Sequence, residues 1–114
     1  MRDQLRQKIR QFLVHSFLYY QLNESIIFDA QYDQICEQLL DLLPKCANRD
    51  IPFRDLVEQS LGDEASGFTI KKYPPSIISA AIHVLYQSQS PLLVFEEFLE
   101  RIGYRYQMEE FKPI

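Results

Sequence analysis

Glycine and cysteine are scarce in this 114-residue sequence, and each shortage argues against a class of functional site. The glycines are Gly62, Gly67 and Gly103, so the chain contains neither a P-loop nor the Gly-x-Gly-x-x-Gly fingerprint of dinucleotide-binding folds. Cys36 and Cys46 form no Cys-x-x-Cys motif and no Cys/His cluster. We therefore expect no metal site and no requirement for an oxidising compartment.

Long apolar runs and an excess of positive charge are missing as well. No apolar stretch reaches 18 residues, so we expect a cytoplasmic protein without a membrane partner. Twelve basic residues face 16 acidic ones, and the resulting net charge of −4 argues against direct nucleic-acid binding. One local basic cluster, Arg2, Arg6, Lys8 and Arg10, is more simply explained as a solvated helix face than as a nucleic-acid patch.

Hydrophobic residues, by contrast, are plentiful. They make up 46% of the chain and include seven tyrosines and eight phenylalanines, which is enough apolar material to fill one core. The length also suits one domain, and no repeat, low-complexity run or linker divides it. We expect a single compact domain over residues 1–114.

Apolar residues spaced three or four positions apart predict two long helices near the N-terminus. Asp3 is the expected N-cap of the first, over 3–21, and Asp29 that of the second, which Pro44 would end. Residues 21–28 break the periodicity. The apolar positions of the two helices are Leu5, Ile9, Phe12, Leu13, Phe17, Tyr20, and then Tyr32, Cys36, Leu39, Leu40 and Leu43.

Three more helices are expected in residues 44–114, where they would complete the core. They are placed at about 52–61, closed by Gly62; from Pro75 to about Gln87; and from a Ser90 cap, with Pro91 at the first position, to Gly103. Residues 63–74 look irregular, and the tail after Gly103 is either a short strand or a frayed extension. The predicted fold is all-α, with about five helices built on an antiparallel helix pair.

The turn between the first two helices gathers chemically useful side chains. Asp29, Tyr32 and Asp33 are spaced i, i+3, i+4, so two carboxylates and a phenol share one face of the second helix. Tyr19 and Tyr20 end the first helix, and the short connection should bring them beside that face. Taken singly, these residues are more often a helix cap and packed aromatics; only their arrangement favours a site.

Such a pocket suits a flat cation that carries hydroxyl groups. Aromatic faces attract cations, and carboxylates accept hydrogen bonds from ribose hydroxyls or an amide. The nicotinamide ring of NAD⁺ or of nicotinamide mononucleotide (NMN) has both properties. His15 lies one turn before Tyr19; it would either line this pocket and meet a phosphate, or be an ordinary packed or surface histidine.

The run LVHSFLYYQLNESIIFDAQYDQICEQLLDL resembles the N-terminal (Ia) domain of NAD⁺-dependent bacterial DNA ligases. That family has a helix ending in Tyr-Tyr or Tyr-His, a short loop, and a second helix beginning Asp-Ala-x-Tyr-Asp. The similarity covers residues 5–43, about a third of the chain. It implies a module that captures the NMN half of NAD⁺, and a free copy of such a module suggests a phage or mobile element.

The resemblance also assigns roles to particular residues. It implies that Tyr19 and Tyr32 flank the nicotinamide ring, that Asp29 and Asp33 bind the ribose and carboxamide side, and that Tyr20 takes the place of the second member of the Tyr-Tyr or Tyr-His pair. The chain departs from the family pattern at the loop, where Asn23-Glu24-Ser25 replaces Asp-x-Pro, and at Phe28, where a small or polar residue is usual.

The ligase reaction itself is not expected. The adenylation motif Lys-x-Asp-Gly is missing, because Lys71-Lys72 is followed by Tyr73-Pro74, and the chain is too short for the adenylation, OB and helix-hairpin-helix domains. We expect a non-enzymatic, stand-alone NMN- or NAD⁺-binding module that acts as a sensor or complements a ligase core. The alternative is an interaction or inhibitor module that binds a ligase or another NAD-using protein. Hydrolysis of NAD⁺ by Asp29 or Asp33 is disfavoured, because their spacing suits binding.

Overall fold

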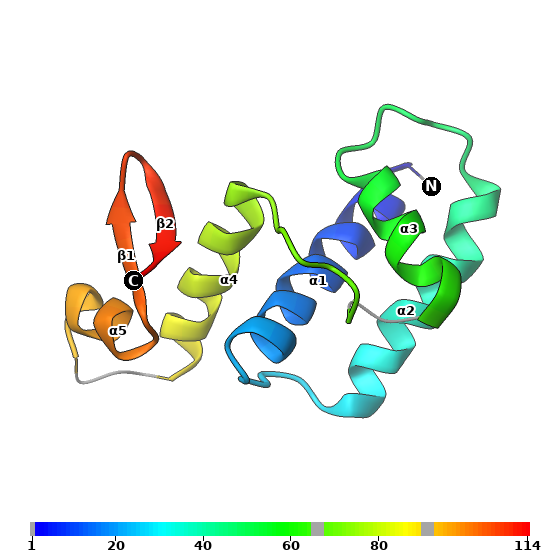
Figure 1. Cartoon of the computed structure of the whole chain (residues 1–114). Coiled ribbons are helices and arrows are strands. Elements are labelled where there is room, and N and C mark those ends of the chain that lie inside the picture. Colours follow the sequence, from blue (N-terminus) through cyan, green and yellow to red (C-terminus); the bar gives the residue numbers. More distant parts are fainter. Residues whose placement is uncertain (1, 65–67, 90–92) are drawn as a thin grey trace.

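One long helix, α1 (Arg2–Gln21), runs through the middle of the molecule, and three other helices pack against it (Figure 1). The computed structural model describes residues 2–64, 68–89 and 93–114. Within them lie four further helices and two strands: α2 (Asp29–Lys45), α3 (Arg54–Glu64), α4 (Pro75–Ser88), α5 (Phe95–Arg101), β1 (Tyr104–Gln107) and β2 (Glu110–Pro113). The predicted five-helix domain built on the first two helices is confirmed, with a small β-hairpin added at its C-terminal end.

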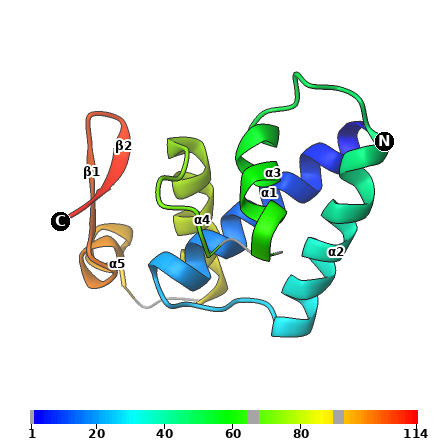
Figure 2. The same ribbon diagram turned by 45° about the vertical axis from the view of Figure 1, so that its right-hand side comes forward.

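Helix α1 is buried along two faces because it has neighbours on both sides. It packs against α2 on one side and α4 on the other, and α5 and the hairpin lie beyond α4 (Figure 2). The apolar repeat of Leu5, Ile9, Phe12, Leu13 and Phe17 is buried as predicted. Three residues outside that repeat, Val14, Ser16 and Leu18, are buried as well.

The N-terminus of α2 differs from the prediction in which residue caps it. Phe28, and not Asp29, is the N-cap; its carbonyl accepts the N–H groups of Gln31 and Tyr32 at 2.9 and 3.1 Å. The Gln31 side-chain oxygen accepts the Phe28 N–H at 2.8 Å, so a side chain inside the helix does the capping. Asp29 is the first helical residue, where its negative charge still favours the helix dipole. Asp3 likewise lies inside α1 and does not cap it.

Two expected helix ends were also wrong. Helix α2 continues through Pro44 to Lys45, and α3 continues through Gly62 to Glu64, so neither residue ends its helix. Helix α4 begins at Pro75 as predicted and ends at Ser88, one residue later than expected. The predicted cap at Ser90 and Pro91 lies outside the described residues, and α5 has Val94 as its N-cap.

The C-terminal tail forms a hairpin, which settles the choice between strand and frayed extension. Gly103 follows α5 with φ +82°, and β1 pairs with β2 in an antiparallel register that sets Gln107 opposite Glu110. Met108 and Glu109 both have positive φ, as a two-residue type I′ turn requires. Two buried rings, Tyr104 and Phe111, fix the hairpin to the helices.

Leu40, predicted to be apolar core, is 45% exposed. No helix in the described part of the chain is long and apolar enough to cross a lipid bilayer.

Arg54 fastens the C-terminal end of α2 to the start of α3. Its guanidinium donates to the carbonyl oxygens of Leu43, Cys46 and Asn48 at 2.6–3.0 Å and to the Glu58 carboxylate at 2.8 Å. The residue is only 6% exposed. The pKa of Glu58 is lowered because this guanidinium donates to its carboxylate, with Arg49 adding a second bond. A single side chain therefore satisfies carbonyls that the end of α2 would otherwise leave without donors.

Replacing Arg54 with methionine should destabilise the protein by about 3 kcal/mol, because buried carbonyls and the Glu58 carboxylate lose their donor. Urea denaturation measures the change. The matched control is Arg49→Met, which removes an exposed arginine from the same carboxylate and should cost about 0.5 kcal/mol. Equal losses from the two variants would contradict the assignment.

Candidate functional site

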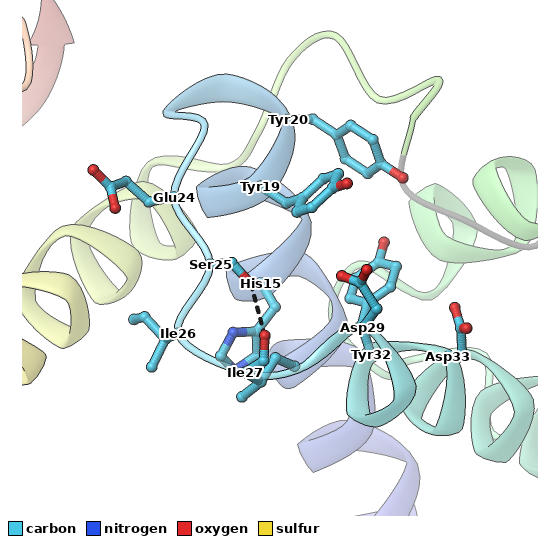
Figure 3. A pocket seen from close by; sticks show the side chains of 10 residues that line it. All are labelled: His15, Tyr19, Tyr20, Glu24, Ser25, Ile26, Ile27, Asp29, Tyr32 and Asp33. Atoms are coloured by element: carbon cyan, nitrogen blue, oxygen red, sulfur yellow. Dashed lines mark hydrogen bonds between the residues drawn. The ribbon is translucent and has the colours of Figure 1, made fainter.

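A pocket of about 250 Å³ lies where the chain turns from α1 into α2. The end of α1, the loop 22–28 and the first turn of α2 form its walls (Figure 3). It collects all six side chains singled out from the sequence, which are His15, Tyr19, Tyr20, Asp29, Tyr32 and Asp33. Their proximity is a feature of the structure, and their role in binding remains a prediction.

Tyr32 is the fixed wall of this pocket. It is half-buried on α2, and its hydroxyl lies 2.7 Å from the hydroxyl of Ser16, a fully buried residue of α1. One side of its ring stacks on Phe12, with ring centres 6.1 Å apart and planes inclined by 23°. The ring is thus held by the core on one side and faces the pocket on the other. Sequence reasoning did not identify Ser16 as its partner, because a serine within an apolar stretch carries no distinguishing pattern.

Tyr19 lies on the other side of Tyr32. The two ring centres are 6.5 Å apart and the planes are inclined by only 18°, so the rings are nearly parallel. Tyr19 is 48% exposed and meets the neighbouring Tyr20 ring edge-on at 4.8 Å. Tyr20 in turn meets Phe68 edge-on at 5.7 Å. The pocket therefore has a fixed aromatic wall, Tyr32, and a second aromatic wall, Tyr19, whose half-exposed ring has room to move.

Carboxylates give the pocket a negative charge. Asp29 and Asp33 project from the first turns of α2 toward the side of Tyr19 (Figure 3). Glu24 also lines the pocket, but in Figure 3 its carboxylate points away from the tyrosines. Three carboxylates, and no lysine or arginine of the described part of the chain, line the pocket, so it favours a cation or a ligand rich in hydrogen-bond donors.

Residues of the loop were not predicted to belong to the site. Besides Glu24, the pocket is lined by Ser25, Ile26 and Ile27. The Ser25 hydroxyl donates to the Ile27 carbonyl at 2.6 Å and tightens the loop. Asn23 supplies the turn with φ 55°, a conformation that asparagine tolerates better than most residues. The broken periodicity of 21–28 indicated a loop, but not the side of the pocket it would form.

His15 lies beneath the loop, beside Ile27 and far from Asp33 (Figure 3). Burial lowers its pKa below the ordinary value of 6.5, since an uncharged ring loses less on leaving water. The ring is therefore neutral at pH 7 and adds no charge to the carboxylate-lined pocket. It can still donate one hydrogen bond to a ligand.

Phe28, which replaces the small or polar residue of the ligase pattern, does not fill the pocket. It is 80% exposed and is not among the lining residues.

Deeper along α2, Cys36 is buried, and its pKa is raised to about 11 by that burial and by the charge of Asp33. Both Cys36 and Cys46 are free thiols. Within the described ranges, no group of three or more His, Cys, Asp or Glu side chains is arranged to hold a metal ion.

Comparisons of the chain with family models, with curated proteins and with solved structures found no match. The chemistry of the site therefore rests on its own geometry. Two nearly parallel phenol rings, two carboxylates on one helix turn and a neutral histidine can bind a flat cation by stacking and hold its hydroxyl or amide donors.

The protein should become less stable as the pH falls below about 6.5, and His15 should account for part of the loss. Because its folded-state pKa is lowered, its contribution is complete above 6.5, the unfolded value, and disappears as the pH drops through the folded value. Urea denaturation at pH 7.5 and pH 5.0 measures this. His15→Gln should show a smaller decrease than the unaltered protein. An unchanged decrease in His15→Gln would contradict the assignment.

Proposed function

We propose that the pocket at the α1–α2 turn binds the nicotinamide mononucleotide moiety of NAD⁺ or NMN. The observation that carries the proposal is the nearly parallel pair Tyr19 and Tyr32, next to Asp29 and Asp33. A nicotinamide ring is flat, positively charged and attached to a ribose, so it matches the aromatic faces and the carboxylates at once. The resemblance of residues 5–43 to the N-terminal domain of NAD⁺-dependent DNA ligases supports the same ligand.

The spacing of the rings shows what binding requires. A ring held between two others needs two carbon–carbon contacts, or about 7 Å from centre to centre. The ring centres of Tyr19 and Tyr32 are 6.5 Å apart, and any sideways offset brings their planes closer than that, so one of the two rings must move to admit a third. Tyr32 is fixed by Phe12 and Ser16, and the half-exposed Tyr19 is free to make that movement.

The volume of the pocket favours half of the dinucleotide. At about 250 Å³ it is below the range of about 300–1,000 Å³ that is usual for small-molecule sites. The nicotinamide and its ribose would occupy it, and the adenylate half of NAD⁺ would lie outside. Because the sequence has no Lys-x-Asp-Gly motif, the proposed role is capture and presentation of the nucleotide, with a DNA ligase core as a possible recipient of the exposed half, and not catalysis.

NAD⁺ should bind about tenfold more tightly than NADH, because reduction removes the positive charge of the ring while the ribose and phosphates remain. Isothermal titration calorimetry with NAD⁺, NADH, NMN and AMP measures the difference. NMN should retain most of the affinity of NAD⁺, and AMP should not bind this pocket. Equal affinities for NAD⁺ and NADH would exclude cation stacking.

Variants of exposed tyrosines separate stacking from general effects on the fold. Tyr19→Leu should weaken NMN binding about tenfold by removing one aromatic wall. Tyr106→Leu is the control: Tyr106 is 60% exposed on β1 and lies outside the pocket. Thermal melts of both variants should stay close to that of the unaltered protein, since neither ring belongs to the buried core.

A second candidate function is favoured by Phe28. A phenylalanine 80% exposed at the N-terminus of α2, beside the pocket, suits contact with another protein better than contact with water. In this alternative the module binds a ligase or another NAD-using protein and recruits or inhibits it.

Phe28→Ser tests this alternative without disturbing the fold, because only the backbone of Phe28 takes part in the cap and serine is itself a good N-cap. The variant should keep its affinity for NMN and lose the captured partner in pulldown experiments. Met108→Ser, which changes a residue 79% exposed in the hairpin turn, is the control and should retain it. Retention of the partner by Phe28→Ser would exclude Phe28 as the contact.

A further inference from the structure

A second pocket, of about 260 Å³, lies on another side of α1 and has the opposite charge. Arg6 and Arg10, one turn apart on α1, form one side of it, and none of the described residues that line it is acidic. Arg6 is nine residues from His15, and Arg10 nine from Tyr19. Nine residues correspond to about two and a half helical turns, so the two pockets occupy opposite faces of α1.

The arginines of this pocket have no competing partner. Among the residues that the structure describes, neither Arg6 nor Arg10 forms an ion pair or hydrogen bond with a side chain. In contrast, Arg2 pairs with Asp50 at 2.9 Å. Two unpaired guanidinium groups in a chain of net charge −4 therefore create a local excess of positive charge.

The N-terminal basic cluster does not act as one surface. Arg2 is engaged by the loop before α3, and Lys8 belongs to a different face of α1, which it shares with Gln38 and Asp41 of α2. Only Arg6 and Arg10 share a pocket. A DNA or RNA backbone needs a continuous row of cations, whereas two arginines at the rim of a pocket suit one anionic group.

The remaining walls indicate the kind of molecule that carries this anion. The half-buried ring of Phe53 and the exposed Pro52 provide an apolar surface, and the fully buried Ile9 and Ile77 lie behind it. Ser76 adds a hydroxyl at the second position of α4, where its backbone N–H has no acceptor within the helix. The pocket thus combines cationic and neutral donors on one side with apolar contacts on the other.

We propose that this pocket binds a small phosphate monoester with an apolar or aromatic body. The phosphate lies between Arg6 and Arg10, near Ser76, and the body rests on Phe53 and Pro52. Guanidinium groups bind phosphate oxygens through paired, charge-assisted hydrogen bonds, which explains the choice of arginine. The site is independent of the nicotinamide pocket and does not rest on the function proposed for it.

Phenyl phosphate is the probe, titrated into the full chain at low salt and followed by calorimetry and by NMR shifts of the Phe53 and Ser76 amides. Arg6→Gln/Arg10→Gln should weaken binding about tenfold, because charged hydrogen bonds are lost. The matched control, Lys8→Gln/Arg101→Gln, removes the same two positive charges from exposed or half-exposed positions outside the pocket and should change the affinity by less than about twofold.

Further titrations identify which part of the ligand, and which pocket, accounts for the binding measured with phenyl phosphate. Inorganic phosphate should bind more weakly than phenyl phosphate, because it lacks the apolar body, and phenol should not bind. The proposal is overturned if phenyl phosphate does not bind at millimolar concentration, or if both double variants weaken it equally. It is also overturned if Tyr19→Leu abolishes binding, which would assign the ligand to the nicotinamide pocket, or if a short DNA duplex binds the arginines while phenyl phosphate does not.

Discussion

The packing of Tyr32 between Phe12 and Tyr19 joins the core of the protein to its surface site. Phe12 and Ser16 belong to α1 and are fully buried, so the position of the Tyr32 ring is set by the same contacts that hold α1 against α2. Asp29 and Asp33 precede and follow Tyr32 within one turn of the same helix. The Tyr32 side of the pocket is consequently formed as soon as the two helices pack, whereas the loop 22–28 completes the other side.

Charge is separated across α1 although the whole chain is only moderately acidic. The pocket at the α1–α2 turn is lined by three carboxylates and the pocket near Phe53 by two arginines, and neither contains the opposite charge. Unpaired charges of one sign in a concave site cost stability, because each lacks a nearby counter-ion. Such an arrangement is typical of surfaces that meet a charged ligand.

Much of the fold could be predicted from local patterns, since amphipathic periodicity reports directly which residues face the core. The repeat in α1 identified Leu5 through Phe17, and the spacing of Asp29, Tyr32 and Asp33 placed three side chains on one face. What local patterns miss depends on tertiary contacts. Val14 and Leu18 lie outside the predicted repeat and are buried because α1 has neighbours on more than one side, and Arg54 is buried where the end of α2 presents carbonyls to it. The N-caps Phe28 and Val94 have no side-chain oxygen of their own, so the usual preference for Ser, Thr, Asp or Asn at this position does not find them.

The contacts of Arg54 with the end of α2 bear on how the protein responds to a change of redox conditions. Cys46 lies beside it, and its thiol is buried and forms no disulfide. A disulfide stabilises chiefly by restricting the unfolded chain, whereas the guanidinium acts only once the carbonyls are assembled. The loop between α2 and α3 is thus closed by an interaction that forms without oxidant or isomerase. Refolding after denaturation needs no sulfur chemistry, and reductants leave the native state unaltered.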